Sequence, residues 1–97
     1  MVGPTMVAVL VSDGEGHKYS KTLPEPTFAD FTAALGQLYA EVDRNQEVAF
    51  VQSSFDTPGG RKVVGADEAT GPADQVALVL WIDMLSDIGV PIDARRF

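Results

Sequence analysis

The chain has 97 residues, of which 45% are hydrophobic and 22% charged, and its net charge is −7. This length suits one globular domain, residues 1–97, with a modest core. The lack of cysteine excludes disulfides and thiolate metal sites. The acidity argues against direct binding of nucleic acid, whose phosphates carry the same charge. The longest apolar run has seven residues, against about 20 in a membrane helix. The amino end, MVGPTMVAVLV, lacks the basic leader of a signal peptide. We therefore expect a cytoplasmic protein that does not enter a membrane.

Negative charge is concentrated in the second half of the sequence. Between Val63 and Ala94 there are six acidic residues and no lysine or arginine. A surface of this kind attracts a basic partner through long-range electrostatics. The other explanation is that the acidic residues serve solubility alone.

The first half of the chain predicts a hairpin followed by a helix. Residues 5–12, TMVAVLVS, are apolar and β-branched and end at the turn sequence DGEG, and residues 17–23 can return as a second strand. Thr27 then begins a helix, with Asp30 three residues later in a capping-box arrangement. The apolar residues of this segment recur at helical spacing and define one face: Phe28, Phe31, Leu35, Leu38 and Val42.

The second half repeats this order, and its last element has two readings. Residues 47–55 and 61–65 predict two strands joined by a turn over 56–60, DTPGG. The apolar run QVALVLWID, residues 75–83, fits either a buried strand or a helix by periodicity alone. Its flanks favour a helix over 72–88, because Pro72 suits a first helical turn and Gly89 with Pro91 supplies a stop. As a strand, the run would add a fifth member to the sheet.

The elements therefore follow the order ββαββα. We expect an α+β two-layer sandwich, in which two hairpins form a four-stranded antiparallel sheet and two helices lie on one face.

The helix over 72–88 is apolar almost all round. On a helical projection its core side gathers Ala77, Leu78, Trp81, Met84, Leu85 and Ile88. Val76 and Val79 fall within the opposite, polar arc and Leu80 lies at its border, where a surface helix is normally polar. Either the chain's own loops cover these residues, or they contact another molecule. The second reading predicts an interface made of Val76, Val79, Leu80, Asp83 and Asp87.

Residues able to support catalysis or metal binding are few. Asp13, Glu15 and His17 alternate along DGEGH, but the intervening glycines indicate a turn, and the chain has no second histidine. No serine lies in an activating motif, and DTPGGRK lacks the phosphate-loop pattern. We therefore expect no metal and no cofactor.

Two functions follow from these patterns. The favoured one is a small, acidic, non-enzymatic protein-interaction module, such as an inhibitor, immunity-type protein, adaptor or assembly component. It would self-associate as a homodimer or bind a basic protein partner. The alternative is a small α+β enzyme or small-molecule-binding domain, with a pocket between sheet and helices lined by Phe28, Phe31, Tyr39 and Trp81. The Ala-, Val- and Asp-rich composition is compatible with a bacterium of high GC content or its phages.

Overall fold

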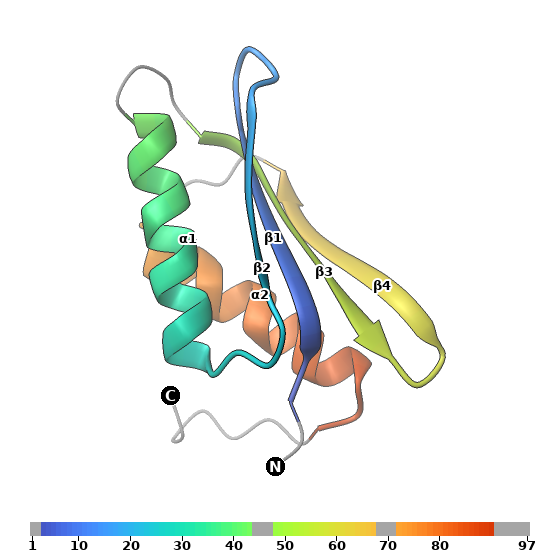
Figure 1. Ribbon diagram of the computed structural model, residues 1–97. Coiled ribbons are helices and arrows are strands. Elements are labelled where there is room, and N and C mark those ends of the chain that lie inside the picture. The colour runs from blue at the N-terminus through green and yellow to red at the C-terminus, as the bar shows by residue number, and fades with distance from the viewer. Residues whose placement is uncertain (1–2, 44–47, 68–71, 91–97) are drawn as a thin grey trace.

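The structure is a computed structural model that describes residues 3–43, 48–67 and 72–90 (Figure 1). Its elements follow the predicted order, ββαββα, and confirm the α+β class. In chain order they are β1 (Thr5–Asp13), β2 (Lys18–Leu23), α1 (Phe28–Asp43), β3 (Val48–Thr57), β4 (Gly60–Asp67) and α2 (Ala73–Asp87).

The four strands form one antiparallel sheet in the order β2-β1-β3-β4. Strands β1 and β3 are central, so the two hairpins meet along them. The β3–β4 pairing runs without irregularity from Phe50 opposite Asp67 to Thr57 opposite Gly60. The turn between these strands is shorter than the predicted 56–60: only Pro58 and Gly59 lie outside the ladder. Gly60 has a φ of +120°, a conformation that suits a residue without a side chain.

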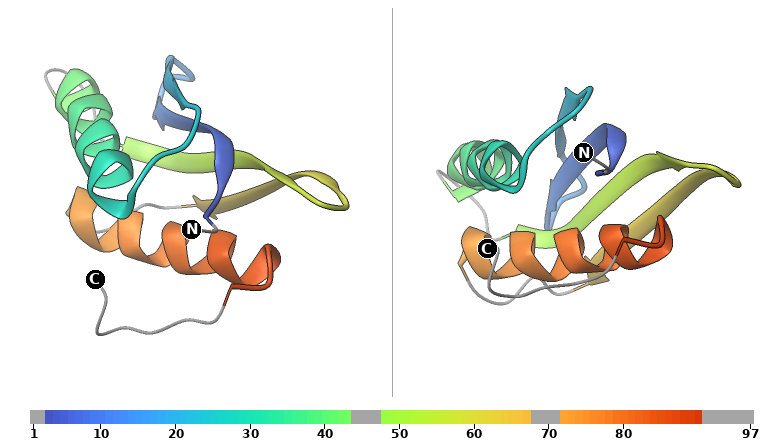
Figure 2. Two further views of the ribbon diagram at one scale, coloured as in Figure 1. Left: turned by 60° about the horizontal axis from the view of Figure 1, so that its bottom comes forward. Right: turned by 90° about the horizontal axis from the view of Figure 1, so that it is seen from below.

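Both helices lie on the same face of the sheet (Figure 2). Alternation along the strands directs Val7, Val9 and Val11 of β1 and Val51 and Phe55 of β3 into the core, and all five are fully buried. Alternate residues of the same strands face the other side of the sheet, where Ala8, Leu10, Phe50, Gln52 and Ser54 are half-buried. The sheet therefore has one apolar, helix-covered face and one mixed face.

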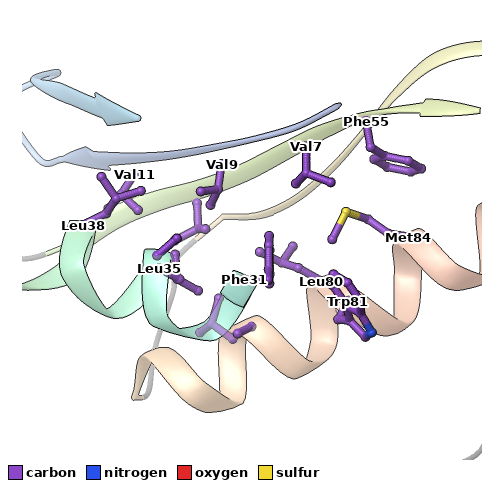
Figure 3. Packing of buried hydrophobic residues seen from close by; sticks show 14 of the residues in the cluster. Val7, Val9, Val11, Phe31, Leu35, Leu38, Phe55, Leu80, Trp81 and Met84 are labelled. Atoms are coloured by element: carbon purple, nitrogen blue, oxygen red, sulfur yellow. The ribbon is translucent and has the colours of Figure 1, made fainter. Parts of the chain in front are cut away.

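Helix α1 begins as its sequence predicts. The Asp30 amide donates to Thr27 Oγ1 and the Thr27 amide donates to Asp30 Oδ2, each at 3.1 Å. These reciprocal bonds satisfy two main-chain donors that the first helical turn leaves unpaired. The expected apolar stripe packs on the sheet and on α2 (Figure 3), with Phe31, Leu35, Leu38 and Val42 buried and Phe28 half-buried.

The run QVALVLWID is helical, which decides between the two readings of this segment. Helix α2 starts after Pro72, and its C-cap Ile88 is followed by Gly89, whose φ is +78°. There the Gly89 amide donates to the Ser86 carbonyl at 3.2 Å and the Val90 amide to the Leu85 carbonyl at 2.9 Å. This is the pattern with which glycine commonly ends a helix. No helix in the described part of the chain is both long and apolar enough to cross a membrane.

The buried face of α2 is rotated from its expected position. Val76 and Leu80, expected in or beside the outward arc, are 8% and 0% exposed, whereas Leu78, expected in the core, is 36% exposed. The cause is that α2 packs against α1 as well as against β3 and β4. Contact with two neighbours buries a wider arc than the single stripe of a surface helix.

Candidate protein-interaction surface

The outward side of α2 carries an apolar patch surrounded by carboxylates. Leu78 and Val79 are 36% and 56% exposed, and the half-buried Ile82 lies one helical turn after Leu78. The exposed acidic residues Asp74, Asp83 and Asp87 flank these side chains on the same helix. We call this set of six residues the α2 surface.

The carboxylates of the α2 surface have no cationic neighbour on their own helix, because α2 contains no lysine or arginine. The ion pairs found within residues 3–43, 48–67 and 72–90 lie elsewhere, at the β1–β2 turn and at Arg61. Asp74 accepts a hydrogen bond only from the adjacent Gln75 amide, at 3.0 Å, among the described groups. The apolar patch is thus bordered by negative charge that the described residues leave uncompensated.

The predicted interface residues divide into two groups. Val79, Asp83 and Asp87 are exposed and contribute to the α2 surface. Val76 and Leu80 belong to the core cluster, so the chain itself covers them. Leu78, which the helical projection assigned to the core, takes their place at the surface.

Three of the four aromatic residues expected to line a pocket, Phe28, Phe31 and Trp81, form a packed cluster. The Trp81 ring lies 5.6 Å from the Phe31 ring and 5.8 Å from the Phe28 ring, measured between centroids, and Phe31 is fully buried. Tyr39 is half-buried against the core. These contacts join α1 to α2, and the Phe31 and Trp81 side chains fill space between the helices (Figure 3).

A shallow depression of about 290 Å³ lies instead between β2 and the first half of α1. Its apolar wall includes Leu23, Pro24 and Ala34. On its rim the Lys21 ammonium donates to the Gln37 side-chain oxygen. No local sequence pattern indicates this depression, because the packing of α1 against β2 depends on how the whole sheet forms.

The β1–β2 turn is organised by one buried carboxylate. Asp13 Oδ1 accepts the main-chain amides of Glu15 at 2.8 Å and His17 at 2.9 Å, and Oδ2 lies 2.9 Å from His17 Nδ1. Desolvation by burial raises the pKa of Asp13, but the hydrogen bonds and the charge of His17 outweigh it, so the pKa is lowered from its usual 3.8. Within the described residues, no three potential ligands are placed to hold a metal ion. The contacts of Asp13 with Glu15 and His17 are those of a turn, as the glycines of DGEGH predict.

Arg61 links three strands in a way that sequence reasoning missed. Its guanidinium donates to Asp56 Oδ1 at 2.7 Å, to the Met6 carbonyl at 3.0 Å and to Ser54 Oγ at 3.2 Å. Met6 has a φ of +50° at an irregularity between β1 and β3, so the arginine fixes a distorted stretch of β1. Met6 and Arg61 are 55 positions apart, and no local pattern relates them.

Comparison of the chain with protein-family models, with curated proteins and with solved structures gives no significant match. The fold and the surface define a two-layer α+β protein with an acidic, partly apolar helix face.

Proposed function

We propose that this protein is a non-enzymatic interaction module that binds a basic protein partner through the α2 surface. The observation that carries the proposal is the exposure of Leu78 and Val79 within a border of carboxylates. A partner segment with apolar residues between lysines or arginines would match this surface in both hydrophobicity and charge.

The two components of the surface would have different roles in binding. Full burial of a leucine or valine side chain is worth roughly 1.5–3 kcal/mol, so Leu78 and Val79 would supply much of the affinity. The exposed carboxylates would chiefly raise the association rate, in a manner that salt weakens. Within this proposal the protein would act as an inhibitor, an immunity-type protein, an adaptor or an assembly component.

The substitution Val79→Asp tests the proposal, because Val79 is exposed and its replacement leaves the core intact. We expect wild-type protein to bind a basic amphipathic peptide of leucine and lysine, with amide shifts in an NMR titration centred on residues 78–83. Val79→Asp should weaken this binding by about tenfold or more, since the lost apolar contact and the desolvation of a carboxylate at the centre of the patch outweigh its attraction to the peptide lysines. Binding should also weaken as salt is raised.

Val63→Asp is the matched control, because Val63 is 57% exposed but lies on β4. It adds the same charge at a similarly exposed valine and should leave peptide binding unchanged. Equal weakening by both variants, or shifts that spread over the whole acidic surface, would contradict a specific site on α2.

A further inference from the structure

We infer that the depression between β2 and α1 binds a zwitterionic dipeptide, whose ammonium group lies at one end and whose carboxylate lies at the other. This inference goes beyond the proposed function, because it uses elements other than α2 and a small ligand in place of a protein partner. It starts from the space between the edge strand β2 and helix α1, which lie side by side (Figure 1). We call this space the β2–α1 groove.

Small side chains on α1 leave room for a ligand in the β2–α1 groove. Ala33 is exposed and Ala34 is 5% exposed, and both line the groove. Leu23 and Pro24 extend this apolar lining beyond the helix. The volume of about 290 Å³ is close to the lower end of the range for small-ligand sites. The groove therefore suits the apolar body of a small molecule.

The end of the groove beside Lys21 is positively charged. The Lys21 ammonium donates to the Gln37 side-chain oxygen, which holds the ammonium on the rim without neutralising it, because an amide is uncharged. Within the described residues, no carboxylate forms an ion pair with Lys21. An ammonium has three donors and an amide nitrogen has two, so this end has donors to spare for a carboxylate.

The other end of the groove carries two carboxylates. Asp30 lies in the first turn of α1 and Glu25 precedes that helix; both line the groove and are exposed. Neither forms an ion pair with another part of the chain that the structure describes. Asp30 Oδ2 accepts the Thr27 amide at 3.1 Å, and no described group donates to the other oxygen. This end therefore favours a cationic group such as an ammonium.

The separation of the two ends fits a dipeptide. Asp30 and Gln37 are seven positions apart on α1, which is about 10.5 Å at a rise of 1.5 Å per residue. Hydrogen bonds of about 2.8 Å at both ends leave about 5 Å between the ligand's charged groups if they lie in line, and up to about 10.5 Å if they stand across the groove. Two extended residues span about 7 Å and one spans about 3.5 Å. A dipeptide is therefore long enough, whereas a single amino acid is too short.

An NMR titration of the full chain with leucyl-leucine tests the inference. We expect saturable amide shifts centred on residues 21–25 and 30–37, with a dissociation constant of about 1 mM or lower. The N-acetyl and carboxamide derivatives of this dipeptide each lack one charge and should bind about threefold more weakly or worse. Free leucine should bind more weakly than leucyl-leucine, because it reaches only one end of the groove.

Two substitutions remove the charges of the groove in turn. Lys21→Gln should weaken binding of leucyl-leucine about threefold or more and barely affect the carboxamide derivative. Asp30→Asn should weaken leucyl-leucine equally and barely affect the N-acetyl derivative, and asparagine keeps an oxygen for the Thr27 amide. The matched controls are Lys18→Gln on β2 and Glu41→Gln on α1, two exposed positions outside the groove lining. They should leave binding unchanged.

The substitution Ala33→Leu tests the location independently of charge. Ala33 is exposed in the groove, so a larger side chain fills the space that the ligand would occupy without entering the core. We expect binding of leucyl-leucine to weaken about tenfold or more, because an occupied groove excludes the ligand. Ala40→Leu, at an exposed position of α1 outside the groove lining, is the control and should keep binding.

Several results would overturn the inference. An absence of shifts at about 10 mM leucyl-leucine would do so, and equal binding of the charged and blocked dipeptides would contradict recognition of both termini. Tighter binding of free leucine would contradict the length, and equal weakening by Ala33→Leu and Ala40→Leu would contradict the location. Val79→Asp should keep dipeptide binding, and Ala33→Leu should keep binding of the basic peptide to the α2 surface. Failure of either proposal is therefore visible without affecting the other.

Discussion

Asp13 shows how one side chain can shape a hairpin. Its two oxygens bind the Glu15 and His17 amides and the His17 ring, while its own amide donates to the His17 carbonyl at 3.0 Å. Asp followed by glycine is a common turn signal, and the sequence was sufficient to predict a turn here. The burial of the carboxylate was not predictable, because it depends on the strands that surround it.

Replacement of Asp13 by asparagine should make the free energy of unfolding change less with pH in the acidic range. The pKa of Asp13 is lower in the folded chain than its usual 3.8, so its contribution is complete above that value and is lost as pH falls through the folded pKa. In urea unfolding we expect Asp13→Asn to have a lower midpoint than wild type near neutral pH. The difference should shrink below about pH 4.

The variant His17→Gln serves as the control for this prediction. It keeps the two main-chain amides that bind Asp13 Oδ1 and removes only the ring contact. Its effect on the midpoint should therefore be smaller than that of Asp13→Asn. A difference between wild type and Asp13→Asn that stays constant down to pH 2 or so would contradict the assignment.

At the scale of elements, α2 shows where pattern reasoning succeeds and where it stops. Its flanking proline and glycine were enough to identify a helix within an apolar run. The choice of buried face was wrong by part of a turn, because nearly every position in the first half of the helix is apolar and the periodicity is weak. Only the contacts with α1, β3 and β4 decide that Leu80 is buried and Leu78 is exposed.

A pair of alanine substitutions measures this orientation. Leu80→Ala removes a fully buried side chain and should lower the free energy of unfolding by about 2–5 kcal/mol. Leu78→Ala, at a position that is 36% exposed, should cost about 1 kcal/mol or less. Urea denaturation followed by Trp81 fluorescence gives both values. A larger loss for Leu78→Ala than for Leu80→Ala would support the orientation that the helical projection predicts. Equal losses would contradict the burial difference between the two residues.

At the scale of the whole molecule, the two hairpins and two helices were predictable because each has a local signal. Thr27 with Asp30 begins α1, and glycine turns separate the strands. The strand order, the Arg61 contacts and the depression beside β2 required the three-dimensional structure, since they join distant segments. The candidate α2 surface was predicted in part: Val79, Asp83 and Asp87 were identified, and Asp74, Leu78 and Ile82 were not.

The sulfur of Met84 offers a different kind of readout. Ser53 Oγ donates to Met84 Sδ at 3.3 Å, and both residues are fully buried, whereas Met6 is 45% exposed. Oxidation makes a methionine polar and bulkier, so peroxide should modify Met6 in the folded protein and reach Met84 only when the core opens. Mass spectrometry of peroxide-treated protein should show this order, and Leu80→Ala should accelerate the second event alone. The rate of Met84 oxidation thus reports how often the core opens, without any added label.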